Sequence, residues 1–137
     1  MRIGVKMTNL QKLAYNIGKR FDNKRLTVFI DHDFKETPNN SGGTRSAYSV
    51  HTVSPGEHLK VYLGVPQEIS EKEKEIRIAH EFGEIAFRKK HPQISRILHR
   101  LGSKQFIGEI PRIINESLAD MEARKKGFKI PYLYHLR

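Results

Sequence analysis

The segment His80-Glu81-Phe82-Gly83-Glu84 combines residue types that bind metal ions and transfer protons. His80 and Glu84 are four residues apart, so on a helix they lie one turn apart on the same face. An imidazole nitrogen and a carboxylate oxygen placed in this way can both reach one divalent cation. The spacing is that of the H-E-x-x-H motif of zinc peptidases, with Glu84 where the second histidine would stand.

A charged, solvent-exposed helix face is the alternative interpretation of this segment. Arg77 with Glu81, and Glu84 with Arg88, form i,i+4 pairs of opposite charge. Such pairs stabilise an exposed helix by only about 0.2–0.5 kcal/mol each. Because short H-E-x-x patterns are also common by chance, the segment by itself leaves both interpretations open.

A helix expected over residues 111–126 favours the metal site. Asn115 and Glu122 mark its exposed direction, whereas Glu116 and Asp120 project to the other side. An ionised carboxylate on an inward face is costly unless it meets a cation, a metal ion or several hydrogen-bond donors. Two such residues one turn apart need a shared explanation, which is either pairing with Arg or Lys from elsewhere or a metal site.

A metal site formed by the two helices would have three protein ligands, His80, Glu84 and Glu116. Asp120 would accept the other imidazole N–H of His80 and fix its tautomer. Three protein ligands leave a position for water, and Glu81 would take the proton from that water as the catalytic base. The chain contains no cysteine, so Zn²⁺ would be bound by nitrogen and oxygen alone. With two carboxylate ligands, Mn²⁺ or Fe²⁺ competes with zinc for the site.

These two helices together resemble the gluzincin metallopeptidases, and in particular the ImmA/IrrE family. Residues 76–83 (IRIAHEFG) are similar to that family's active-site helix, and residues 115–120 (NESLAD) are similar to the gluzincin glutamate helix. The family pattern has His where this chain has Glu84. The resemblance spans roughly residues 7–127 and implies a small zincin-like domain that hydrolyses a protein substrate, such as a transcriptional repressor. It also implies that the substrate adds as a strand to the sheet edge formed by residues 47–63.

Local sequence patterns predict a single α+β domain over residues 1–137. Helices are expected over residues 7–21, 70–90, 93–101 and 111–126, and strands over residues 26–30, 47–53 and 59–63. The last two strands form a hairpin beside the first, which gives a three-stranded, mostly antiparallel sheet. The resemblance implies that the 70–90 helix is the active-site helix and that the 111–126 helix is the glutamate helix.

The charge of the chain supports a different kind of partner. There are 25 Lys and Arg against 15 Asp and Glu, a formal net charge of +10. Such a surplus favours acidic partners, including nucleic acid. The residues that would contact phosphates lie in one run without acidic residues: Arg88, Lys89, Lys90, Arg96, Arg100 and Lys104.

A catalytically inactive member of the fold that binds protein or nucleic acid through this basic surface is therefore the alternative hypothesis. An unrelated helical nucleic-acid-binding protein is a further one. The sequence has no recognisable helix-turn-helix motif or aromatic stacking platform. No apolar run approaches the roughly 20 residues needed to cross a bilayer, so we expect a cytoplasmic protein without membrane contact.

Overall fold

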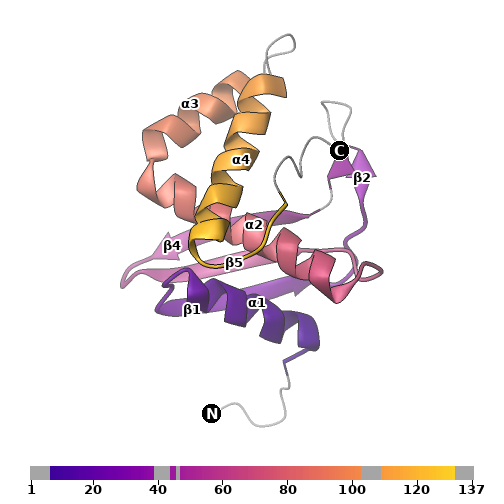
Figure 1. Cartoon of the computed structure of the whole chain (residues 1–137). Coiled ribbons are helices and arrows are strands. Elements are labelled where there is room, and N and C mark those ends of the chain that lie inside the picture. The colour runs from indigo at the N-terminus through magenta and orange to yellow at the C-terminus, as the bar shows by residue number, and fades with distance from the viewer. Residues whose placement is uncertain (1–6, 39–43, 46, 103–108, 132–137) are drawn as a thin grey trace.

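The computed structural model describes residues 7–38, 44–45, 47–102 and 109–131, and it has the α+β class that the sequence predicts. The helices are α1 (Asn9–Arg20), α2 (Glu71–Lys90), α3 (Pro92–Gly102) and α4 (Glu109–Lys125). The strands are β1 (Arg25–Asp31), β2 (Thr37–Pro38), β3 (Thr44–Arg45), β4 (Tyr48–Ser54) and β5 (His58–Gly64). Figure 1 shows α1 and α2 beside the sheet, α4 next to α2, and α3 next to α4.

The main sheet has the strand order β1-β5-β4, with β5 in the middle. β4 and β5 form the expected antiparallel hairpin, but β5 pairs with β1 in parallel. The chain leaves β1 and enters β4 on the far side of the sheet. The hairpin then returns β5 into the gap between them, in the same direction as β1. The sheet is thus mixed, whereas the sequence predicted a mostly antiparallel one.

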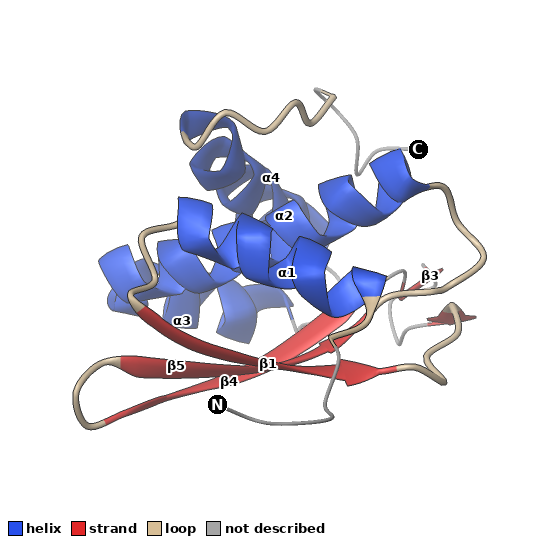
Figure 2. Cartoon of the chain, turned by 90° about the horizontal axis from the view of Figure 1, so that it is seen from below, coloured by secondary structure: helices blue, strands red, loops and turns tan. Residues whose placement is uncertain are grey.

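The helices lie on one face of this sheet (Figure 2). Alternation along each strand directs Val28, Val61 and Leu63 to that face, where they are buried. Ile78 and Phe82 of α2 are buried in the same core cluster. Burial of these side chains fixes the height of α2 above the sheet.

The two long helices start and pack as their residue types dictate. Ser70 caps α2 by accepting a hydrogen bond from the backbone N–H of Glu73. Small residues, Ala79 on α2 and Ala119 on α4, are fully buried, which allows the helix backbones to approach closely. α4 therefore faces α2 along the turns that carry the candidate site.

One expectation for α4 is wrong, because Glu122 is buried and not exposed. Its carboxylate accepts a hydrogen bond from Lys90 at 2.6 Å and another from Lys125 at 3.3 Å. Burial by itself would raise the pKa of Glu122, but these two ammonium groups outweigh it and hold the pKa below its usual value. The pair with Lys90 connects the C-terminal end of α2 to α4.

Across the described residues, every helix is too short or too polar to cross a membrane.

Candidate metal and acid–base site

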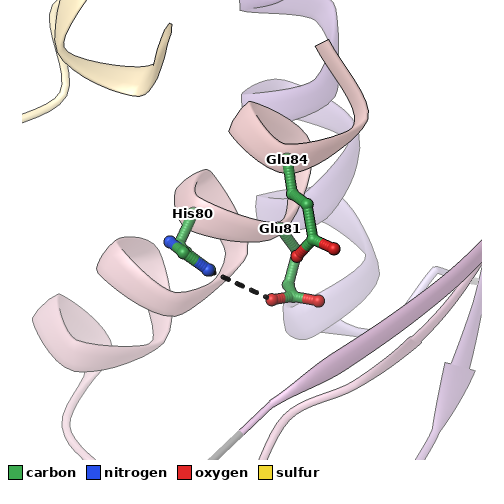
Figure 3. Close-up of side chains that lie close together, drawn as sticks. All are labelled: His80, Glu81 and Glu84. Carbon is green, nitrogen blue, oxygen red and sulfur yellow. Dashed lines mark ion pairs between the residues drawn. The ribbon is translucent and has the colours of Figure 1, made fainter. Parts of the chain in front are cut away.

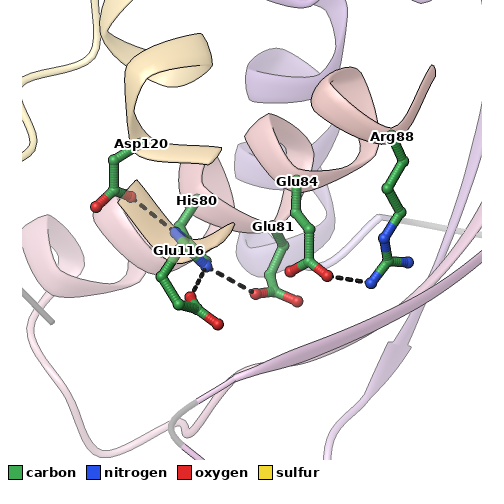
Figure 4. Close-up of polar contacts among 6 residues, drawn as sticks. All are labelled: His80, Glu81, Glu84, Arg88, Glu116 and Asp120. Atoms are coloured by element: carbon green, nitrogen blue, oxygen red, sulfur yellow. Dashed lines mark hydrogen bonds and ion pairs between the residues drawn. The ribbon is translucent and has the colours of Figure 1, made fainter. Parts of the chain in front are cut away.

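His80 lies at the point where α2 faces α4, and it is 7% exposed. Its Nδ1 is 2.7 Å from Oδ1 of Asp120, and its Nε2 is 2.5 Å from Oε2 of Glu116. Both carboxylates come from α4 and are one turn apart. The inward Glu116 and Asp120 thus meet the same imidazole ring, one at each nitrogen (Figure 4).

Glu81 and Glu84 continue the cluster along α2. His80, Glu81 and Glu84 each offer one ligand atom, and these atoms all lie within 4.8 Å of one another. Oε2 of Glu81 is 3.9 Å from Nε2 of His80. Figure 3 shows the carboxylates of Glu81 and Glu84 next to each other on the side of the helix that carries His80.

The carboxylate of Glu84 has a cationic partner in the structure. Arg88, one turn further along α2, donates a hydrogen bond to Oε1 of Glu84. This is one of the two i,i+4 pairs expected from the sequence. A cation bound by Glu84 would therefore compete with Arg88 for that oxygen.

The other expected pair does not form. Arg77 contacts Glu73 at 3.3 Å and Glu36 at 2.8 Å. Glu81 is only 7% exposed, because it lies on the face of α2 that turns toward β4. The interpretation of this strip as a solvent-exposed helix face is thus wrong for His80 and Glu81.

Burial and neighbouring charges shift the pKa values of His80 and Glu81. Burial alone would lower the pKa of His80, but the charge of Glu116 and the hydrogen bond that the imidazole donates to Asp120 raise it well above its usual value. The two carboxylates thus favour the protonated form of the His80 imidazole. Burial raises the pKa of Glu81 to about 7, opposed by His80 and reinforced by the charges of Glu84 and Glu116.

β4 supplies two neighbours that the sequence did not identify. Ser49 hydrogen-bonds the carboxylate of Glu81, and His51 lies close enough to Arg88 for that charge to act on it. Burial, followed by the charge of Arg88, lowers the pKa of His51. Strand alternation places Ser49 and His51 on the same face but does not say which face is buried. Val50, on the other face of β4, is 61% exposed.

The basic run does not form a single free surface. Arg88 is paired with Glu84, and Lys90 is paired with Glu122. Arg96 and Arg100 are exposed on α3, and Lys89 is exposed at the end of α2. Lys104 lies outside the described residues.

The residues around His80 fit a divalent cation by their chemistry. One imidazole nitrogen and several carboxylate oxygens converge from two helices, and Asp120 holds the second imidazole nitrogen in the way that metal-bound histidines are held. The excess of negative side chains in a buried place also calls for a cation. Comparison with protein-family models, with curated proteins and with solved structures found no match to this chain.

Proposed function

We propose that this protein is a metal-dependent hydrolase that cleaves a peptide bond in a protein substrate. The observation that carries the proposal is the contact of one buried imidazole, His80, with two carboxylates of a facing helix, Glu116 and Asp120. Glu81 and Glu84 lie beside it. A helix that needed only a stable core would bury apolar side chains here, because paired charges gain little once desolvation is counted.

The ligands in this proposal are His80, Glu84 and Glu116, with Zn²⁺ as the expected ion and Mn²⁺ or Fe²⁺ as competitors for a site rich in oxygen. When bound, the ion supplies a Lewis acid for the scissile carbonyl and acidifies a water molecule. Asp120 is expected to keep its hydrogen bond to Nδ1 of His80, which leaves Nε2 free to bind. Glu116, which contacts Nε2 of His80 in the structure, would then bind the metal ion instead.

Glu81 is the proposed general base. It accepts a proton from the attacking water and passes that proton to the leaving amine as the peptide bond breaks. Its raised pKa, about 7, suits both halves of this transfer at neutral pH. The Ser49 hydroxyl, which hydrogen-bonds its carboxylate, orients it from β4.

The edge of β4 is the proposed place for the substrate. β4 is the last strand on its side of the three-stranded sheet, and it carries Ser49 next to Glu81. An extended peptide that adds as a strand along β4 would bring a backbone carbonyl close to Glu81. A folded repressor with an exposed flexible segment, encountered in the cytoplasm, is the kind of substrate that this arrangement suits.

A second candidate function rests on the Glu84–Arg88 pair. With Arg88 on Glu84 and both nitrogens of His80 hydrogen-bonded, each of these buried charges has a partner without a metal ion. Such a cluster suits a catalytically inactive member of the fold that binds a protein or nucleic-acid partner. The first candidate needs a bound metal ion for its activity, whereas the second needs none.

The experiment that separates them measures metal content and cleavage on the same preparations. The protein is loaded with Zn²⁺ or Mn²⁺ and incubated with a peptide library, and new termini are detected by mass spectrometry. We expect cleavage by the loaded protein, and a loss of about 10²- to 10⁴-fold in the Glu81→Gln variant with its metal content unchanged.

Glu75→Gln provides the matched control, because Glu75 is an exposed glutamate on the same helix. It should retain both metal and cleavage. A wild-type protein that takes up no stoichiometric metal and cleaves no peptide would favour the inactive candidate, and stoichiometric metal without cleavage would contradict the hydrolase activity. Cleavage that is equal in Glu81→Gln and wild type would contradict the role of Glu81.

A further inference from the structure

The face of the sheet opposite the helices carries a row of apolar side chains that crosses all three strands. Phe29 of β1 pairs in register with Tyr62 of β5, which pairs with Val50 of β4. Their exposed fractions are 50%, 48% and 61%. The described helices all lie on the other side (Figure 2), so none of them covers this row.

A third aromatic ring, that of Tyr48, extends this row and is fixed in place. Tyr48 lies 6.4 Å from Tyr62, ring centre to ring centre, and its hydroxyl donates to Oδ2 of Asp31 at 2.8 Å. The ring crosses over Gly64, where a Cβ would lie 2.1 Å from a ring carbon. Phe34 packs edge to face against Tyr48, with the ring centres 5.1 Å apart. Tyr48 is therefore held in place beside Tyr62. We define the aromatic platform as Phe29, Tyr62 and Tyr48.

Cationic and hydroxyl side chains precede the platform on the same face. Strand pairing places Lys60 in register with Thr27 and Thr52. Lys60 is two residues before Tyr62 on β5, so it lies on the same face, next to the aromatic row. Arg25 and His58 form the next pair outward. Nε2 of His58 lies 2.7 Å from the hydroxyl of Thr27, which confirms that these side chains share a face.

Negative charge is scarce on this face. Within the described strands, the face carries one carboxylate, Asp31, and that group accepts the hydrogen bond from Tyr48. Lys60 and Arg25 are exposed. A ligand that crosses from the cationic end to the platform thus meets positive charge first and aromatic rings second.

We propose that this face binds single-stranded nucleic acid, with bases stacked on Phe29 and Tyr62 and the phosphate backbone near Lys60 and Arg25. Flat rings at the surface of a sheet, bordered by cations, are how proteins bind unpaired bases, since every base has a face that can stack. The net charge of +10 favours the same partner. This site is separate from the His80 cluster, which lies on the helix side, and does not depend on the proposed hydrolase activity.

A second copy of the chain or another protein is the competing occupant of an exposed apolar face. Protein interfaces are depleted of lysine at their centre, whereas Lys60 adjoins the aromatic row. The apolar part of the face is also small, with one row of three side chains and the edge of Tyr48. These features favour a partner that brings phosphates.

The test measures binding of a fluorescein-labelled oligonucleotide of about 12 nucleotides, single-stranded and then as a duplex, by fluorescence anisotropy at fixed salt. We expect the single strand to bind more tightly than the duplex. Phe29→Leu and Tyr62→Leu keep apolar area but remove the ring, and each should weaken single-strand binding roughly 5- to 150-fold. Tyr62→Phe keeps the ring and should bind as wild type does. Circular dichroism shows whether each variant is folded.

The matched control removes charge away from the platform, in the double variant Arg96→Ala with Arg100→Ala on α3. It should lose less affinity than the ring variants, and its loss should shrink as salt rises. The proposal is overturned if the wild type does not bind, or if both leucine variants bind as wild type does. It is equally overturned if light scattering finds a dimer that Phe29→Leu dissociates.

Discussion

Gly83 of α2 lies directly against the backbone carbonyl of Ala119 in α4, so that a Cβ on Gly83 would be 2.1 Å from that oxygen. No side chain fits into this space. The contact stands between the turn that carries His80 and the turn that carries Glu116 and Asp120. The distance from the imidazole to both carboxylates therefore depends on a residue without a side chain.

Gly83→Ala should force the two helices apart. Overpacking of a tight core contact costs about 1–3 kcal/mol of unfolding free energy, and here the obstacle is backbone, which cannot rotate away. Urea denaturation checks the value. Ser117→Ala, an exposed substitution on α4, should change stability by less than about 0.5 kcal/mol. Equal stability of Gly83→Ala and wild type would contradict the close packing of α2 on α4.

Asp120→Asn should weaken metal binding without removing a proposed ligand. The substitution keeps the shape of the side chain but removes the charge that orients His80, and loss of such a partner typically lowers metal affinity about 10- to 100-fold. Competition with a chromophoric chelator gives the affinity. Asp33→Asn, at an exposed position away from the site, is the control. An unchanged affinity in Asp120→Asn would show that Asp120 does not act through the metal site.

Glu84 and Arg88 give opposite expectations if Glu84 is a ligand. Arg88→Ala removes the cation that competes for the Glu84 carboxylate and should raise metal affinity, whereas Glu84→Gln should lower it. Lys89→Ala removes the same charge from the neighbouring exposed position and controls for general electrostatics. If Arg88→Ala and Lys89→Ala shift the affinity equally, Glu84 serves only the ion pair.

Glu122 should make stability depend on pH in the acid range. Its pKa is lower in the folded protein than its ordinary value of 4.5. A carboxylate of this kind adds stability that is fully present above 4.5 and is lost as pH falls through the folded pKa. The melting temperature, measured from pH 6 downward, should therefore fall less steeply in Glu122→Gln than in wild type. Parallel curves for the two proteins would contradict the buried pairing with Lys90 and Lys125.

Much of the site arrangement could be predicted because it depends on helix periodicity. Positions 80, 84, 116 and 120 are fixed by turns of about 3.6 residues, so the inward direction of Glu116 and Asp120 followed from the sequence alone. The small residues Gly83 and Ala119 favour a close contact between helices. Serine, the residue type at position 70, favours a helix N-cap, and the Ser70 side chain accepts a hydrogen bond from the backbone N–H of Glu73.

The remaining features depend on contacts between distant segments, which local patterns do not encode. The parallel pairing of β1 with β5 follows from the side of the sheet on which β4 enters. The burial of Glu122 depends on Lys90, which is 32 residues away. Alternation in β4 placed Ser49 and Val50 on different faces of the strand, but it did not reveal that the face with Ser49 is turned toward Glu81. The same ambiguity concealed the aromatic platform on the outer face.

A metal site at His80 is tested most directly by the metal content of the protein after loading with Zn²⁺ and removal of free ion. Elemental analysis measures this content for wild type and His80→Ala. We expect about one equivalent of metal per folded wild-type chain and its loss in the variant, because the site is formed by convergent ligands. Glu75→Gln should retain the wild-type content. A wild-type protein without stoichiometric metal, or a His80→Ala variant that retains it, would rule out a metal site at His80.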